Sequence, residues 1–376
     1  MNNVISEKFE FSRWWQAVDR VMLVSLLAIV LFGILLIFAA SPAVATRINV
    51  DKYHFVVSHI TLLIPSLIGM FVISHFTPRQ IRLMALILFP IMLALTYGTL
   101  FVGQEIKGAT RWIHIPGMSI QPSEFMKPLF AIVSAWLFAK ACEISRFPGK
   151  LIACGVYLVS VAALLLQPDL GMTVVLTSIF ACEFFLAGLP VVWVGIGGAM
   201  GVVGLVAAYF IFPHVSSRVD RFLSPQAGDT YQIDRSLEAF MNGGWFGTGP
   251  GDGTVKRGLP DAHADFIFSV SGEELGLIWT ALLLFLFMII VLRGLSRASQ
   301  QKDMFVLLAV SGIITQFGLQ ALVNMGSALH LIPTKGMTLP FVSYGGSSLL
   351  ALALGMGMVL ALTRRDAVPP GTQNQL

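Results

Sequence analysis

The chain has 376 residues, of which 56% are hydrophobic and only 12% are charged, and its formal net charge is +4. Soluble domains carry about 25% charged residues, so this composition excludes an ordinary soluble fold. The basic residues form no run with interleaved aromatic residues, which argues against a nucleic-acid-binding protein. Cys142, Cys154 and Cys182 lie in or beside apolar runs and predict neither a disulfide framework nor a metal site.

Apolar runs recur along the whole chain, and a helix of about 20 apolar residues crosses a bilayer core of about 30 Å. We therefore predict an all-α polytopic membrane protein with about ten transmembrane helices. The predicted spans are Val21–Ala40, Phe55–His75, Ile81–Val102, Phe125–Lys140, Leu151–Leu166, Gly171–Gly188, Val191–Phe212, Phe266–Leu292, Met304–Leu329 and Gly345–Thr363. The first run resembles a signal peptide, but it is longer than the 7 to 15 residues of a signal core, so we interpret it as an uncleaved span.

The distribution of Lys and Arg sets the predicted orientation, because cytoplasmic loops carry an excess of both. One side of the predicted bundle receives Arg79, Arg82, Arg293 and Arg297 together with the basic residues near both ends of the chain. Both termini are therefore predicted to be cytoplasmic. The expected organisation is a cytoplasmic segment (residues 1–20), one transmembrane domain (residues 21–363) and a cytoplasmic tail (residues 364–376).

Three connections then face outward and contain most of the remaining polar residues. They are Gly103–Glu124, Pro213–Asp265 and His330–Tyr344. The second lies between the seventh and eighth spans and is too long for a simple connector, which indicates a functional loop. Its Gln232–Phe240 part is amphipathic and could lie on the membrane surface.

The first outward connection combines Arg111 with a polar helix start. Gln121, Glu124 and Lys127 are spaced three residues apart, so they share one face of the first helical turn. One interpretation is an ion pair between Glu124 and Lys127 at the helix start. The other is a binding function, because two charges that enter a membrane helix require a stronger reason than capping.

The third outward connection contains Lys335, Ser343 and the paired glycines Gly345 and Gly346. Adjacent glycines allow close helix packing or close approach to a ligand. Packing does not explain Lys335, and a lysine on the outer surface suits an anionic headgroup.

The long connection ends in a cluster of titratable residues. Asp265 comes just before an apolar run, and we expect it to cap the following helix and to stay ionised beside the helix's positive end. His263 either orients Asp265 or is an ordinary loop residue. Glu273 and Glu274 lie about two turns inside the run, and a structural hydrogen-bonding role for Glu274 is favoured over lining a site.

Four stretches together resemble the SEDS family of membrane proteins (shape, elongation, division, sporulation). They are TRWIHIPGMSIQPSEFMKP, QPDLG, GTGPGDGTVKRGLPDAHADFIFSVSGEELG and PTKGMTLPFVSYGGSS. They are spread over most of the chain in the family's order, and the predicted number of spans agrees. Lys335–Pro340 and the GTVKRGLP run are more similar to the division branch, FtsW, than to the elongation branch, RodA. The chain departs from the usual pattern at His330 and at Ala264, where it reads HAD.

The resemblance implies a peptidoglycan glycosyltransferase that polymerises lipid II at the outer face of the bacterial inner (cytoplasmic) membrane. For the division branch it implies septal cell-wall synthesis, with a class B penicillin-binding protein transpeptidase (FtsI-like) and other divisome membrane proteins as partners. It implies no nucleic acid. By position, the family's catalytic aspartate is Asp265. No cofactor is assigned beyond the option of a divalent cation at the pyrophosphate, and no metal ligands are assigned.

The residues are compatible with that reaction. It joins a sugar hydroxyl to an anomeric carbon whose leaving group is undecaprenyl pyrophosphate, so it needs a carboxylate base and cations that hold the diphosphate. We predict Asp265 as the base. The predicted substrate-binding residues are Arg111, Lys127 and Lys335 as cations, with Gln121, Glu124, His263 and Ser343 as further contacts.

Three alternatives remain at this point: a flippase for the same lipid-linked precursor, an inactive scaffold, and a RodA-like elongation enzyme. A flippase predicts charges along a path through the bundle, whereas here the polar residues gather at the outer face. A scaffold leaves Asp265, Lys127 and Lys335 unexplained together.

Overall fold

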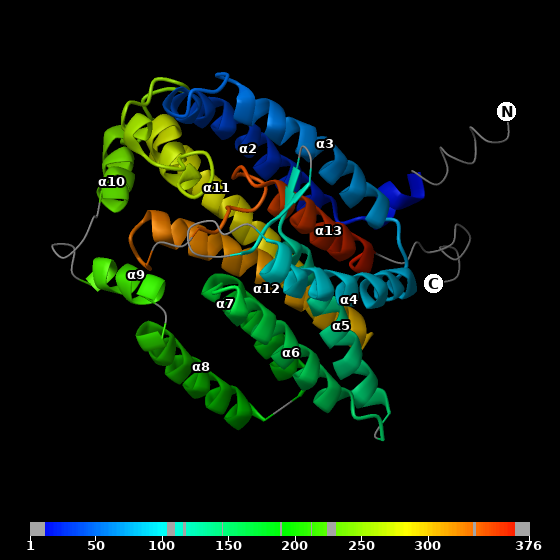
Figure 1. Cartoon of the computed structure of the whole chain (residues 1–376). Helices are drawn as coiled ribbons and strands as arrows, with labels where there is room; N and C mark the ends of the chain where they lie inside the picture. Colours follow the sequence, from blue (N-terminus) through cyan, green and yellow to red (C-terminus); the bar gives the residue numbers. More distant parts are fainter. Residues whose placement is uncertain are drawn as a thin grey trace.

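The structure is a computed structural model, and it describes residues 12–103, 110–115, 118–144, 146–188, 190–211, 213–223, 231–333 and 336–364. Most of these residues are helical (Figure 1). Residues 1–11 and 365–376, which form much of the two predicted cytoplasmic tails, lie outside the described residues.

Each of the ten predicted spans coincides with an apolar helix, which confirms the helical polytopic fold. The helices are α2 (Arg20–Arg47), α3 (His54–Ile73), α4 (Pro78–Val102), α5 (Pro122–Glu143), α6 (Gly149–Leu166), α7 (Leu170–Leu186), α8 (Val191–Ile211), α11 (Ile267–Ser299), α12 (Met304–Ala328) and α13 (Gly346–Leu362). Seven of them are long and apolar enough to cross a membrane, and α7, α13 and the 195–211 part of α8 are apolar but shorter. The α2 helix extends beyond its predicted end, through Pro42 to Arg47.

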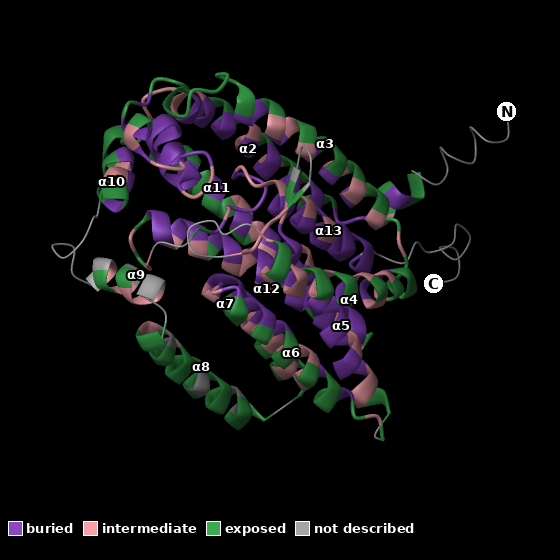
Figure 2. Cartoon of the chain, in the orientation of Figure 1, coloured by how far each residue is buried: buried purple, intermediate pink, exposed green. Residues whose placement is uncertain are grey.

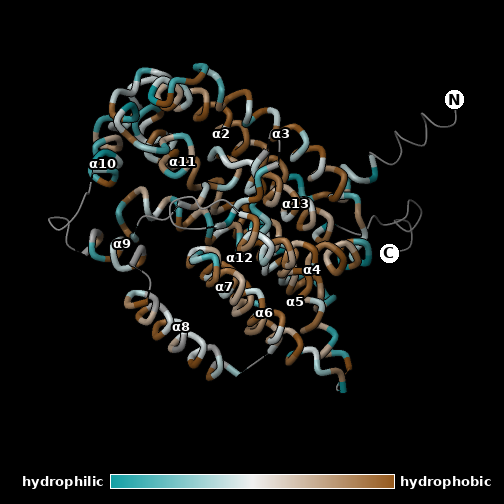
Figure 3. The backbone as a smooth tube through the Cα atoms, viewed as in Figure 1, coloured by the Kyte–Doolittle hydropathy of each residue, from teal (hydrophilic) through white to brown (hydrophobic). Residues whose placement is uncertain are grey.

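The core of the bundle consists of α5, α12 and α13. In the most apolar windows of α5 and α12, 72% and 67% of the residues are buried, against 22% for α4 (Figure 2). The peripheral helices α3, α4, α6 and α8 instead expose large apolar side chains such as Val57, Ile87, Leu158 and Val202. Hydrophobic residues predominate along these helices (Figure 3). A soluble monomer rarely exposes apolar surface on this scale, whereas a helix in contact with lipid requires it.

The long connection between α8 and α11 is largely helical in the part that the structure describes. It contains α9 (Pro213–Leu223), α10 (Tyr231–Gly243) and the short 3₁₀-helix η2 (Val255–Gly258). The predicted amphipathic segment lies within α10, whose buried residues Ile233, Ser236, Ala239 and Gly243 recur at helical spacing. This face packs against the start of α11 (Figure 1), where Ser236 Oγ lies 2.6 Å from Ser269 Oγ.

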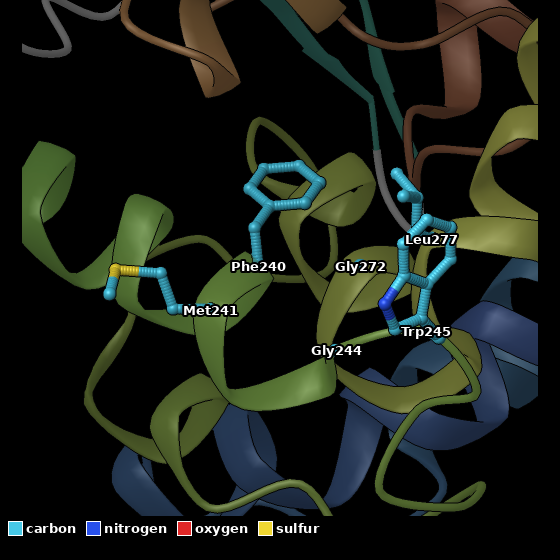
Figure 4. Close-up of a pocket in the computed structure, with 6 residues that line it drawn as sticks. All are labelled: Phe240, Met241, Gly244, Trp245, Gly272 and Leu277. Atoms are coloured by element: carbon cyan, nitrogen blue, oxygen red, sulfur yellow. The ribbon is translucent and has the colours of Figure 1, made fainter.

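The α11 helix is interrupted at Gly276, which has φ 77° and ψ 179°. The loop that follows α10 fills the interruption and binds the main-chain groups that the break releases. Thr248 N donates to Glu273 O (2.9 Å), Gly249 N to Glu274 O (3.1 Å) and Leu277 N to Gly244 O (2.9 Å). An irregular backbone at membrane depth is tolerated only where protein satisfies its polar groups, as here. In Figure 4, Gly244 and Trp245 of this loop lie beside Gly272 and Leu277 of α11.

The connection between α4 and α5, predicted as a loop, forms a short antiparallel hairpin. Its strands are β1 (Ile113–Ile115) and β2 (Met118–Ile120), with Ile113 opposite Ile120. The hairpin leads into α5, which begins at Pro122 as expected for proline in a first turn.

Candidate active site

Asp265 lies at the end of the long connection, partly exposed, two residues before α11 begins. The N-cap of α11 is Phe266, one residue after Asp265, and the Phe266 side chain makes no capping hydrogen bond. The prediction that Asp265 caps α11 is therefore wrong. The chain turns here, with Asp265 N bonded to Asp261 O at 3.0 Å, so the helix starts one residue too late for that role. The Asp265 carboxylate instead faces the third outward connection, where a Cβ added to Gly336 would lie 3.2 Å from Oδ2.

The main chain around Asp265 is held from outside its own segment. Three successive carbonyls, those of residues 263–265, each accept a hydrogen bond from another part of the fold. Tyr344 N donates to His263 O (2.9 Å), Ser343 Oγ to Ala264 O (2.6 Å) and Asn324 Nδ2 to Asp265 O (3.0 Å). The end of the long connection is therefore hydrogen-bonded both to the third connection and to α12.

Ser343 was predicted to contact substrate, but its hydroxyl is already bound. Its Oγ donates to Ala264 O and accepts from Leu339 N at 2.7 Å, and the residue is 3% exposed. The structure therefore gives Ser343 a role in holding the two connections together.

The His263 side chain is enclosed by aromatic rings. Its ring centroid lies 4.1 Å from that of Phe55 and 5.2 Å from that of Tyr344. Burial lowers the pKa of His263 to about 4, so the imidazole is neutral at pH 7. Among the described residues its Nδ1 has no hydrogen-bond partner. His263 therefore contributes to packing beside Asp265.

Lys127 and Glu124 form the ion pair that the sequence offered as one of two interpretations. Lys127 Nζ lies 2.7 Å from Glu124 Oε2, and the Lys127 side chain is fully buried. Lys127 Nζ also donates to Gln320 Oε1 (3.3 Å), and Gln320 Nε2 donates to Thr338 O and to Ser348 Oγ (both 3.2 Å). This network connects α5 and α12 to the third connection, and it buries the ammonium that was predicted to contact a headgroup.

Gln121 is buried at the start of α5. Its main-chain N donates to Ser347 Oγ (2.9 Å) and its Nε2 to Ser123 Oγ (3.2 Å). The main-chain bond fixes the start of α5 against α13, and the side-chain bond stays within the first turn of α5.

Arg111 is bound to the QPDLG motif. Its guanidinium donates to Gln167 O (3.2 Å) and Pro168 O (2.6 Å) and lies 3.3 Å from Asp169 Oδ2. Asp169 also caps α7 by accepting from Met172 N at 3.2 Å. The Arg111 side chain keeps 29% of its area exposed, so it can offer a cationic edge to an anion. Lys335 lies outside the described residues, although it precedes Gly336, the residue beside the Asp265 carboxylate.

Two glutamates of α11 hold the loop that fills its interruption, as favoured for Glu274 from the sequence. Glu274 is bonded to Lys256 Nζ through Oε1 and accepts from Gly251 N (3.0 Å) through Oε2. Glu273 accepts from Val255 N (2.7 Å) and Lys256 N (2.9 Å). Burial lowers the pKa of the Lys256 ammonium, and the nearby Glu273 carboxylate opposes that shift.

A profile of the family of FtsW, RodA and SpoVE proteins, described as "Cell cycle protein", matches residues 19–367. A protein from Caulobacter vibrioides named "Probable peptidoglycan glycosyltransferase FtsW" is 45% identical over 354 residues, which cover 94% of this chain and 90% of that protein. The chain is an FtsW-like member of this SEDS family. A relative from Geobacter metallireducens with the same name is 36% identical and covers 92% of this chain and 95% of its own length.

Solved structures support the same fold for this FtsW-like chain. A chain from the structure titled "Structural coordination of polymerization and crosslinking by a peptidoglycan synthase complex" superposes with a TM-score of 0.76 at 28% identity, covering 93% of this chain and 98% of that one. The crystal structure of the rod shape determining protein RodA from Thermus thermophilus gives a TM-score of 0.68 at 28% identity, covering 93% and 97%.

The polar face of α12 was not predicted from the sequence. Gln316, Gln320 and Asn324 recur every four residues and are all nearly fully buried. Three carboxamides on one face of an otherwise apolar span are a usable signal, because polar groups inside a membrane helix require partners. Two of them, Gln320 and Asn324, bind the third connection directly.

In the part of the chain that the structure describes, no three His, Cys, Asp or Glu side chains are placed to hold a metal ion. A divalent cation at the pyrophosphate stays an untested expectation.

Proposed function

We propose that this FtsW-like chain polymerises lipid II into glycan strands at the outer face of the bacterial inner membrane, during septal wall synthesis. Asp265 is the general base, and undecaprenyl pyrophosphate is the leaving group. The observation that carries the proposal is the position of Asp265. The residue is partly exposed, its main chain is held by two other parts of the fold, and its carboxylate faces the connection that contains Lys335.

The reaction joins the acceptor sugar's hydroxyl oxygen to the anomeric carbon of the donor, and the bond from that carbon to the pyrophosphate breaks. The hydroxyl proton passes to the Asp265 carboxylate as the new bond forms. Pyrophosphate leaves as an anion, so no second carboxylic acid is required, in contrast to glycoside hydrolysis. Cations stabilise the charge that develops on the leaving group.

The cations proposed for this role are Lys335 and Arg111. Lys335 adjoins the residue that faces Asp265, and Arg111 keeps an exposed edge. Lys127 is removed from this set because its ammonium is buried against Glu124 and Gln320. Replacing Lys335 by Met should weaken lipid II binding in a folded protein, and unchanged affinity would contradict its assignment.

Charged residues inside the spans support catalysis over a flippase. Lys127 is paired with Glu124 and Glu274 with Lys256, which is typical of structural ion pairs and not of a transit path. Glu183 is buried beside Gly312 and belongs to neither pair. The relatives named FtsW support a role in division and not one in elongation.

A membrane-anchored transpeptidase of the class B penicillin-binding type is the proposed partner, since a related solved structure is titled as a peptidoglycan synthase complex. The proposed orientation has both termini in the cytoplasm and the long connection outside. A reporter fused at Gln226 should behave as extracytoplasmic, and a cytoplasmic signal would contradict the orientation.

The experiment that tests the function directly uses purified full-length protein, with its transpeptidase partner, on labelled lipid II. Glycan polymer should form and undecaprenyl pyrophosphate should be released. Movement of intact lipid II across vesicles without polymer would favour the flippase instead.

A further inference from the structure

Asn324 lies near the end of α12, fully buried, and its carboxamide joins two separate outward connections. Its Nδ2 donates to Asp265 O (3.0 Å) and to Met337 O (2.7 Å). One side chain thus fixes the main chain at Asp265 and the main chain one residue beyond Gly336. Because a helix is rigid, the two bonds hold both connections at fixed positions relative to one residue of α12.

The contacts around Asn324 leave the two connections little freedom to move relative to each other. Gly336 approaches the Asp265 carboxylate so closely that even a Cβ would lie 3.2 Å from Oδ2. One turn earlier on α12, Gln320 binds Thr338 O in the same way, so the third connection is bound to α12 at two places. A small shift of either connection relative to the other would change the distance between the Asp265 carboxylate and the segment after Lys335.

Resting on the proposed function, we infer that Asn324 is a positioning residue for polymerisation. It holds the Asp265 carboxylate at a fixed distance from the third connection, and so from substrate bound there. Asn324 does not touch the reacting atoms. A misplacement of about 1 Å can reduce a rate about a hundredfold, so loss of this amide should lower turnover much more than it lowers lipid binding.

The test compares Asn324→Ala with Gln316→Ala, which makes the same kind of truncation at an equally buried carboxamide two turns earlier on the same helix. Polymerisation by the full-length protein with its partner is measured on lipid II, with lipid II affinity and thermal stability measured in parallel. Asn324→Ala should reduce kcat about ten- to a hundredfold with lipid II affinity changed less than about twofold. The Gln316 variant should keep its turnover at a comparable loss of stability. Equal turnover in the two variants would overturn the inference.

Further variants distinguish a positioning role of Asn324 from a folding defect and from the assignment of Asp265 as the base. Asn324→Ser retains one hydroxyl donor, which can serve at most one of the two carbonyls, and it replaces the Ala variant if that protein does not fold. The Asn324 loss should shrink when Asp265→Glu has already displaced the carboxylate, because residues that act as a unit are not additive. Fully additive losses would overturn the inference and leave Asp265 as the base. An active Asp265→Asn enzyme would overturn the proposed base itself.

Discussion

The ion pair between Lys256 and Glu274 gives a quantitative test of how the interrupted α11 is stabilised. Both side chains are almost fully buried, with exposed fractions of 4% and 0%. Lys256→Met removes the cation and leaves the Glu274 carboxylate buried with one described main-chain donor, Gly251 N. Breaking a buried pair in this way costs about 3–5 kcal/mol, which is about a hundredfold to several thousandfold in the unfolding equilibrium.

The double variant Lys256→Met/Glu274→Gln separates the charge from the hydrogen bond. Glutamine keeps an acceptor for Gly251 N and removes the unpaired charge, so most of the loss should be recovered. Unfolding is followed by tryptophan fluorescence in one detergent. The expected order of stability is wild type, then the double variant, then the single variant. A single variant as stable as the wild type, or a double variant no better than the single one, would refute the reasoning.

Three further predictions concern the site and its supports. The pKa of His263 is about 4 in the folded chain and about 6.5 in the unfolded chain. The contribution of the neutral, buried ring to the free energy of unfolding is therefore complete above pH 6.5 and is lost as the pH falls towards 4. Between pH 7.5 and pH 5 the wild type should lose about 2 kcal/mol more unfolding free energy than His263→Phe, and parallel pH curves would contradict this. Gly276→Ala should destabilise the protein by more than the ~1–3 kcal/mol of its extended positive-φ conformation, because the added Cβ also collides with the loop main chain. Gly195→Ala, where a Cβ meets open space, should not destabilise it. Lys127→Met should lower thermal stability, and adding Glu124→Gln should restore part of it; a lipid-binding loss at full stability would instead support a headgroup contact.

The apolar runs predicted the helices well because membrane spans are selected by length and apolarity alone. The α10 helix was also predictable, since Ile233, Ser236 and Ala239 recur at helical spacing. The interruption of α11 was not. Gly276 lies inside a predicted span, two residues after Glu274, and its close contact with the distant loop around Gly247 appears only in the structure.

The site was predicted in part. Asp265 and the third connection do meet, as the clustering of polar residues at the outer face indicated. Burial could not be predicted for Lys127 or Ser343. A polar residue near a helix end gives the same sequence pattern whether its side chain faces water or a buried partner. The carboxamide spacing of Gln320 and Asn324 was visible, but their partners are more than ten residues away along the chain.

The central claim is that Asp265 takes the proton from the acceptor hydroxyl. Asp265→Asn keeps the size of the side chain and removes its basicity. Asp261→Asn, in the same turn, makes the same chemical change at a residue with φ 52°, a conformation that Asn adopts as readily as Asp, and serves as the matched control.

Both variants are purified with the transpeptidase partner and assayed for glycan polymer from labelled lipid II, with thermal stability measured alongside. General-base catalysis is worth about 10² to 10⁴ in rate, so the Asp265→Asn protein should lose polymerisation by about that factor while it remains folded, and the control should stay active. A folded Asp265→Asn protein that polymerises lipid II at close to the wild-type rate would contradict the account.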